Sequence, residues 1–238
     1  MSDNVNRYGA DIYTEAEGSE DTLANLGPLR PLAGIWEGTI GANQHPIGPG
    51  SDIKGQVIDR NEHSVYVERY ELQPTDPQTS GPQLFYGLRY HVHIVRPGEV
   101  ETFHDQVGYW LWEPAARMVI HTIAIPRGQV LLAAGSAEPD ATEFEVTAAA
   151  GSEEYGILSN PFINTAFRTV SFRMRVTTHN DGTWSYEEDT VMQMADRAEL
   201  AHHIDRNTLT RIGEPTPNPV ALAANHPHDV SSGGAIET

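Results

Sequence analysis

The stretch Phe103–Ala134, FHDQVGYWLWEPAARMVIHTIAIPRGQVLLAA, decides the fold of this 238-residue chain. It consists of two or three runs in which aromatic and β-branched residues alternate with others, separated by Glu-Pro-Ala-Ala and Pro-Arg-Gly breaks. Such alternation is typical of β-strands, because successive side chains point to opposite faces of a sheet. His104, Asp105 and His121 lie among the apolar residues. Polar side chains within this alternation indicate a sheet whose inner face lines a cavity.

Similar runs continue along most of the chain. The segment His179–Gly182 predicts a hairpin turn, since Asn and Asp-Gly tolerate positive φ. Around ten short strands without long helical patterns favour an all-β fold, a ten-stranded antiparallel up-and-down barrel of the lipocalin or fatty-acid-binding type. Leu26–Leu32 contains two prolines and predicts one short helical turn before the first strand. The predicted strands are 33–40, 52–59, 63–72, 83–95, 101–112, 118–125, 129–134, 143–148, 166–178, 185–194 and 208–212.

Composition divides the chain into three parts. Residues 1–24 carry six acidic residues and one arginine, and they predict an acidic, flexible N-terminal extension. Residues 25–213 form the predicted ligand-binding barrel. Residues 214–238 are rich in Pro, Gly, Ser and Asn and predict a disordered tail.

Charge and residue usage exclude several classes of function. The formal net charge of −18 repels phosphate backbones and anionic membrane surfaces, so neither nucleic acid nor membrane is an expected partner. The chain has no cysteine, which excludes disulfides and thiolate ligands to zinc, iron–sulfur clusters or haem. No basic-then-apolar signal and no membrane-length apolar run occurs, so we expect a soluble cytoplasmic protein.

Four motifs carry a family resemblance. Pro28–Gly38, PLRPLAGIWEG, is similar to the leucine-rich turn and Gly-x-Trp-x-Gly strand that open members of the nitrobindin family. His45-Pro46 lies where that family has an aromatic-Pro pair. Phe103–Trp110 resembles its strand with the pattern hydrophobic-His-x-Glu-x-Gly-Tyr, and Ala201–Ile204 resembles the segment that presents its iron-binding histidine. The resemblance covers roughly residues 26–212.

The resemblance implies a function and a set of site residues. It implies a barrel that holds ferric haem b, binds nitric oxide and isomerises peroxynitrite to nitrate. His203 then matches the iron ligand, and His104 matches the distal histidine with a catalytic role. Two positions depart from the family pattern: Ile40 replaces the last glycine of Gly-x-Trp-x-Gly-x-Gly, and Ile47 stands where a small hydroxyl residue is expected. Both are expected to lie near the haem and to narrow its pocket.

Other interpretations stay open. Trp36 and His121 are further candidates for the cofactor pocket, whereas His203 is alternatively a core histidine that tethers the closing strand. His91 and His93 share one strand face and would bind a metal if His121 or His104 supplied a third ligand. A second function is a haem-free carrier of a fatty acid or another small apolar ligand. A third is a lipocalin-like enzyme that uses pocket histidines, and a homodimer is compatible with each.

Overall fold

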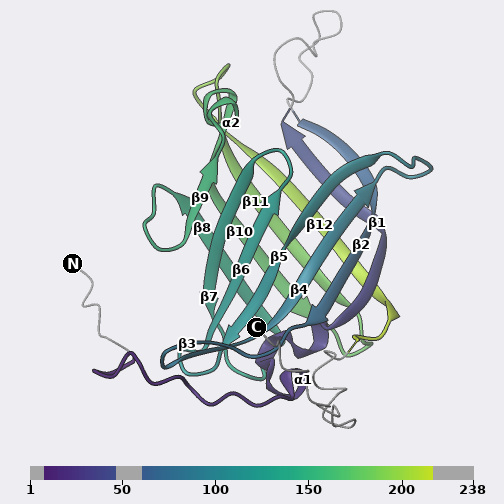
Figure 1. The fold of residues 1–238 in the computed structure, drawn as a ribbon. Coiled ribbons are helices and arrows are strands. Elements are labelled where there is room, and N and C mark those ends of the chain that lie inside the picture. Colours follow the sequence, from purple (N-terminus) through teal and green to yellow (C-terminus); the bar gives the residue numbers. More distant parts are fainter. Residues whose placement is uncertain (1–7, 47–60, 217–238) are drawn as a thin grey trace, which may run out of the picture.

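A computed structural model describes residues 8–46 and 61–216. The predicted strand 52–59, the candidate pocket residue Ile47 and most of the predicted C-terminal tail lie outside these residues. Within them, the structure is a β-barrel with short helices at its two ends (Figure 1).

One sheet of twelve strands forms this barrel in the described part of the chain. Ten of the strands form the closed ring β1-β2-β4-β5-β6-β7-β8-β10-β11-β12, in which every pairing is antiparallel. The short strands β3 and β9 pair with this ring and were not expected from the sequence. The predicted antiparallel barrel is therefore confirmed, with two additional short strands. The elements are α1 (Thr22–Asn25), η1 (Gly27–Leu32), β1 (Gly34–Pro46), β2 (Asn61–Pro74), β3 (Gln78–Ser80), β4 (Gln83–Val95), β5 (Thr102–Glu113), β6 (Met118–Ile125), β7 (Gln129–Ser136), β8 (Glu143–Ala150), β9 (Gly156–Ser159), α2 (Pro161–Ala166), β10 (Phe167–Thr178), β11 (Trp184–Met194) and β12 (Leu200–Gly213).

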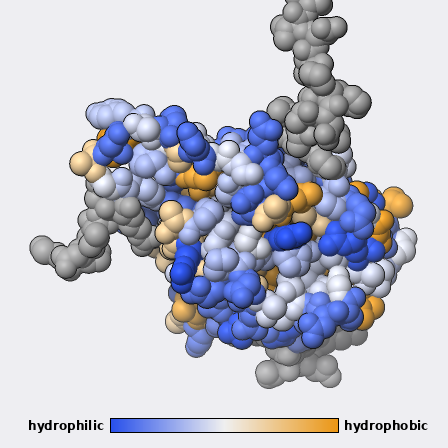
Figure 2. Space-filling model, turned by 90° about the horizontal axis from the view of Figure 1, so that it is seen from below, coloured by the Kyte–Doolittle hydropathy of each residue, from blue (hydrophilic) through white to orange (hydrophobic). Residues whose placement is uncertain are grey.

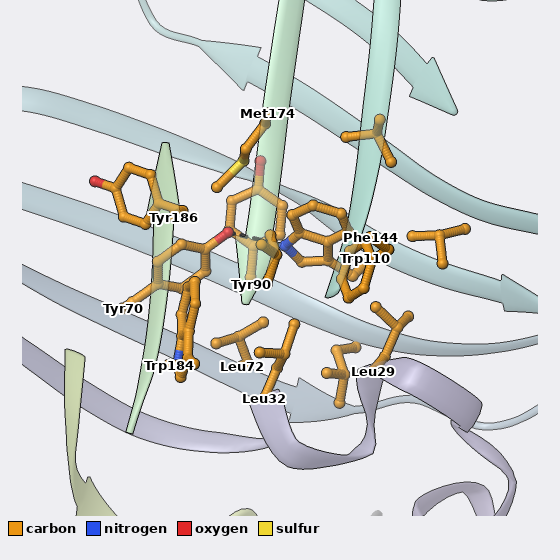
Figure 3. Close-up of a cluster of buried hydrophobic side chains, with 14 of the residues drawn as sticks. Leu29, Leu32, Tyr70, Leu72, Tyr90, Trp110, Phe144, Met174, Trp184 and Tyr186 are labelled. Carbon is orange, nitrogen blue, oxygen red and sulfur yellow. Dashed lines mark hydrogen bonds between the residues drawn. The ribbon is translucent and has the colours of Figure 1, made fainter. Parts of the chain in front are cut away.

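The end of the barrel next to η1 is filled by a solid core (Figure 3). The two prolines of η1 suit a short 3-10 turn, and its leucines Leu29 and Leu32 are fully buried against the barrel. All four tryptophans of the chain are buried at 2% exposure or less. Large aromatic side chains remove roughly 150–250 Å² each from water, so this layer closes the barrel at one end. The four are Trp36, Trp110, Trp112 and Trp184.

Residues 8–21 run along the same end of the barrel. The hydroxyl of Tyr8 hydrogen-bonds to the carboxylate of Glu113, and the backbone N–H of Ser19 donates to the hydroxyl of Tyr86 at 2.9 Å. These contacts attach to the barrel a segment that we predicted to be a flexible extension. Figure 2 views this end and shows a mainly hydrophilic surface with a few hydrophobic residues between.

The described part of the chain contains no helix that combines the length and the apolar character needed to span a membrane. Its two α-helices have four and six residues.

Candidate functional site

An internal cavity of about 220 Å³ lies between the solid core and the end of the barrel that carries α2. We call this the inner cavity, and the end near α2 its mouth. Its walls combine apolar side chains with histidines, carboxylates and tyrosines. The lining residues used below are Asn43, Tyr66, Glu68, Ile94, Phe103, His104, Gln106, Ile123, Ile125, Arg127, Ile163, Phe167, Tyr186, Glu188, Met192, His203 and Asp205.

Strand alternation in β12 decides which of two adjacent histidines reaches the inner cavity. His203 lines the cavity. The side chain of His202 is 51% exposed on the outer face, where its Nδ1 lies 2.9 Å from a carboxylate oxygen of Asp189. Successive residues of a strand point to opposite faces, so His203 faces the cavity and His202 faces solvent.

The imidazole of His203 is oriented from two neighbouring strands. Its Nε2 lies 2.7 Å from Nδ2 of Asn43 and 3.1 Å from Oδ2 of Asp205. The amide of Asn43 also donates to Oδ1 of Asp205 at 2.7 Å. Burial lowers the pKa of His203, which opposes the effect of the nearby Asp205 carboxylate. The ring is therefore biased to the neutral form, the form in which imidazole binds metals.

His104 lies on β5, on the opposite side of the ring of strands from β12. Its Nε2 is 3.2 Å from Oε1 of Gln106, and its Nδ1 is 3.4 Å from Nη2 of Arg127. Burial lowers the pKa of His104, and the charge of Arg127 lowers it further. The even-numbered face of β5 thus points inward, a choice that periodicity alone left open.

Two glutamates make the middle of the inner cavity acidic. Glu68 is 2% exposed and accepts hydrogen bonds from the hydroxyl of Tyr186 at 2.9 Å and from Nδ2 of Asn207 at 2.8 Å. Burial raises the pKa of Glu68 to about 7. Burial, together with the carboxylates of Asp205 and Glu68, raises the pKa of Glu188 to about 8. Both side chains therefore bind a proton far more readily than a solvated glutamate does.

Ile40 does not lie where we expected it. The pairing of β1 with β2 shifts register between Gly38 and Gly41, and both residues within this bulge are exposed. Ile40 is 79% exposed, so the structure corrects its expected place beside a cofactor. After the bulge, the inward alternation of β1 resumes with Gly41 and Asn43.

Trp36 and His121 belong to the solid core and are not among the described residues that line the inner cavity. Nε1 of Trp36 donates to the carbonyl of Leu32 at 2.7 Å, which fastens η1 to the barrel. The ring of His121 stacks on Trp110 with 3.6 Å between centroids. Both were cofactor candidates, and the structure places them in the core, outside the described lining of the inner cavity.

The proposed three-histidine metal site is not assembled. His91 and His93 lie on the outer face of β4, where Nε2 of His91 is 2.9 Å from the carboxylate of Asp105. His104 and His121 point inward. Residues 8–46 and 61–216 contain no group of three His, Cys, Asp or Glu side chains arranged to hold a metal ion.

A larger hollow of about 670 Å³ lies over the outer faces of β4, β5 and β6. Outward-facing residues such as Arg89, His91 and Val107 line it, whereas His104 and His203 do not. The inner cavity is therefore the better candidate site, although it is the smaller of the two.

Several cavity residues were missed at the level of sequence. Glu188 lies in the run Glu187-Glu188-Asp189, whose composition is typical of a solvated strand face. Only its neighbours Glu187 and Asp189 face outward, where they pair with Arg206 and His202. The position of Glu68 was predictable from the sequence, because it lies on the same strand face as three large residues that are buried. Those residues are Tyr66, Tyr70 and Leu72.

Comparisons with known proteins agree with this architecture. The crystal structure of Rv2717c from M. tuberculosis is similar with a TM-score of 0.52 and 19% sequence identity. The similarity covers 79% of this chain and 96% of that chain, so it supports the fold. No curated protein matches the sequence.

A family match identifies the barrel. Residues 25–211 match the family described as "THAP4-like, heme-binding beta-barrel domain". The match spans most of the chain, including β1 with its Gly-x-Trp-x-Gly motif and β12 with His203. It confirms the resemblance inferred from the sequence motifs. The chain therefore belongs to the family of THAP4-like haem-binding β-barrel domains.

Proposed function

We propose that the inner cavity binds one haem b through His203, and that the haem protein binds nitric oxide or isomerises peroxynitrite to nitrate. Membership of a haem-binding family supports the first part. The observation that carries it is the His203–Asp205 pair inside the barrel, with 3.1 Å between Nε2 and Oδ2. A histidine that ligates a metal characteristically donates its other ring N–H to a carboxylate or carbonyl.

The donor chemistry of the cavity fits a haem. Nε2 of His203 can either accept from Nδ2 of Asn43 or, when it carries the proton, donate to Oδ2 of Asp205. In the second tautomer, Nδ1 keeps the lone pair that an iron ligand requires. Among the described residues, the hydrogen bonds of His203 are made through Nε2. Apolar side chains that would contact a porphyrin line the same cavity: Ile94, Phe103, Ile123, Phe167 and Met192.

The residues of this chain have distinct roles in the proposal. The bound haem would supply the iron at which nitric oxide or peroxynitrite binds. His203 would hold the haem, and Asp205 would accept from its Nε2–H in place of the contact that Nε2 makes with the amide of Asn43. His104 lies across the barrel in the same cavity and bounds the space on the other side of the ligand. The apolar part of the wall would limit the access of water to that space.

Haemin titration of the purified protein tests this proposal. We expect a Soret band that saturates at one haem per chain, and a pyridine haemochrome spectrum typical of haem b. His203→Ala should lose or shift the band, whereas His202→Ala should not, because His202 lies on the outer face. Absence of a Soret band in the wild type, or an unchanged band in His203→Ala, would contradict the proposal. The nitric oxide and peroxynitrite activities are then measured on the haem-loaded protein.

The size of the inner cavity favours a second candidate function, a carrier of a fatty acid or another apolar molecule. The volume enclosed by the described residues is about 220 Å³, below the roughly 300–1,000 Å³ typical of small-molecule sites. A slender ligand needs less enclosed space than a porphyrin. Native mass spectrometry of the freshly purified protein separates the two functions, since a retained lipid without haem supports the carrier.

A further inference from the structure

A chain of hydrogen bonds runs from the mouth of the inner cavity to the barrel wall. Nη2 of Arg127 lies 3.4 Å from Nδ1 of His104, and Nε2 of His104 lies 3.2 Å from Oε1 of Gln106. Nε2 of Gln106 donates to the hydroxyl of Tyr90 at 2.8 Å. This hydroxyl donates in turn to the carbonyl of Thr122 at 2.9 Å.

The direction of this chain fixes the state of His104. Since the hydroxyl of Tyr90 accepts from the amide nitrogen of Gln106, the amide oxygen faces His104 and can only accept. Nε2 of His104 must therefore carry the proton, and Nδ1 accepts from Arg127. Both ring nitrogens are occupied within the protein. Within this hydrogen-bond chain of described residues, Arg127 is the side chain that keeps further N–H donors at the mouth, because its guanidinium has five N–H groups.

The backbone of Arg127 is held in place from the other side of the mouth. Arg127 lies in the turn between β6 and β7, and its carbonyl accepts from Nδ2 of Asn160 at 2.7 Å. The N–H of Asn160 donates to the carbonyl of Gly128 at 2.9 Å. Asn160 also caps α2 by accepting from the N–H of Ile163. The turn and α2 are thus joined, and the guanidinium is presented by an anchored backbone.

The described wall of the inner cavity carries several carboxyl groups and one cationic side chain. Among the described lining residues, Arg127 is the only lysine or arginine, whereas Glu68, Glu188 and Asp205 all contribute carboxyl groups. An anionic group in the middle of the cavity would face the carboxyl groups of Glu68 and Glu188 without a cationic partner among the described lining residues. An anionic group at the mouth meets the guanidinium instead. Arginine is well suited to this contact because it binds a carboxylate through two parallel hydrogen bonds.

We propose that Arg127 binds the carboxylate of the cavity ligand and so orients an amphipathic acid with its apolar body inward. The proposal deepens the proposed function, on which it rests for the existence of a cavity ligand. Its chemistry is shared by the propionates of haem and by the head group of a fatty acid. Apolar side chains that line the same cavity, including Phe103, Ile125 and Ile163, would contact the ligand body.

Paired probes with and without the charge test the proposal. Haemin is compared with haemin dimethyl ester by absorbance, and cis-parinaric acid with its methyl ester by fluorescence. The variants are Arg127→Gln and the control Arg175→Gln, in which the arginine pairs with Glu145 on the outer face. We expect Arg127→Gln to weaken binding of the acid about tenfold or more and to leave binding of its ester unchanged, as loss of a charged hydrogen bond predicts.

The results test the haem proposal and the role of Arg127 separately. If haemin fails to bind the wild type while cis-parinaric acid binds better than its ester, the haem proposal fails and the role of Arg127 is tested on the fatty acid. If Arg127→Gln keeps the wild-type ratio of acid to ester affinity, the role of Arg127 is wrong even when haemin binds. A wild type that prefers neither acid over its ester also overturns it. Thermal melting of both variants checks that they are folded.

Discussion

One carboxyl group of this barrel serves two partners: Asp205 lies 3.1 Å from Nε2 of His203 through Oδ2 and accepts from the amide of Asn43 at 2.7 Å through Oδ1. Asn43 and Asp205 are directly opposite each other in the pairing of β1 with β12. The strand that closes the barrel therefore also places the orienting carboxylate beside the candidate ligand. Closure of the fold and orientation of the histidine depend on the same pair of strands.

Asp205→Asn should weaken haemin binding without unfolding the barrel. The amide cannot hold the proton on Nε2 of His203 as a carboxylate does, and loss of such a partner typically costs roughly 10–100-fold in metal affinity. The matched control is Asp189→Asn, which removes the carboxylate beside His202 on the outer face. Haemin titration followed by absorbance gives both affinities. Equal affinities for the two variants would contradict the role of Asp205.

Glu68→Gln should change the dependence of stability on pH. The pKa of Glu68 is raised from about 4.5 in the unfolded chain to about 7 in the fold. Between these values the unfolded chain releases a proton that the fold retains, so the free energy of unfolding decreases as pH rises. The difference of 2.5 pH units corresponds to roughly 3 kcal/mol. Glutamine has no carboxyl proton to release, so the variant does not lose this stability as pH rises. Its amide oxygen can still accept hydrogen bonds from Tyr186 and Asn207.

Urea unfolding at pH 4.5 and pH 8 measures this effect. The free energy of unfolding of Glu68→Gln minus that of the wild type should be larger at pH 8 than at pH 4.5. We expect this change with pH to be on the order of 3 kcal/mol. Glu187→Gln is the control, because its carboxylate is exposed to Arg206 and Arg173 and its pKa is lowered. The two variants showing the same change with pH would refute the burial effect.

The alternation of the sequence predicted most of the barrel, because nearly every long strand has one apolar face and one polar face. It could not choose the inner face of β5, since Tyr109 and Trp110 are both large aromatics on opposite faces. The choice comes from packing: Nε1 of Trp110 donates to the hydroxyl of Tyr70 at 2.9 Å inside the core. Tyr109 is 45% exposed.

The composition of the inner cavity was less predictable. Asn43 and Asp205 are 162 residues apart, and only the register of β1 against β12 brings them together. Because of the bulge between Gly38 and Gly41, the even-numbered residues of β1 face inward before it and the odd-numbered residues after it. The sequence pattern of the strand does not predict this change. Gly38 has a packing role, since a Cβ there would lie 2.3 Å from Nδ2 of Asn207, the residue that donates to Glu68.

Ile40→Gly restores the glycine of the family pattern and tests the bulge. Because Ile40 is 79% exposed, we expect haemin affinity to be unchanged. Stability should fall by roughly 0.5–1 kcal/mol, the usual cost of glycine inside a strand. Val65→Gly, at an exposed position of the adjacent strand β2, is the matched control for that cost. Tighter haemin binding by Ile40→Gly alone would show that Ile40 restricts the pocket.

His121→Phe should stabilise the barrel. Within the described structure, neither ring nitrogen of the fully buried His121 has a hydrogen-bond partner, while the ring stacks on Trp110. Phenylalanine keeps a stacked ring and removes two unsatisfied polar atoms, each of which typically costs about 1–3 kcal/mol when buried. Haemin affinity should not change, because His121 is not among the described residues that line the inner cavity.

The effect of His121 should grow in acid. Burial places its pKa well below 6.5, so below about pH 6.5 the unfolded chain binds a proton that the fold does not. The free energy of unfolding of the wild type therefore decreases as pH falls, whereas that of His121→Phe should not show this contribution. Denaturant unfolding at pH 7.5 and pH 5 measures both effects. His121→Gln is the control, since it keeps buried polar atoms at the same place and should not stabilise. A His121→Phe variant that is less stable than the wild type at both values would mean that His121 contributes more than its stacked ring.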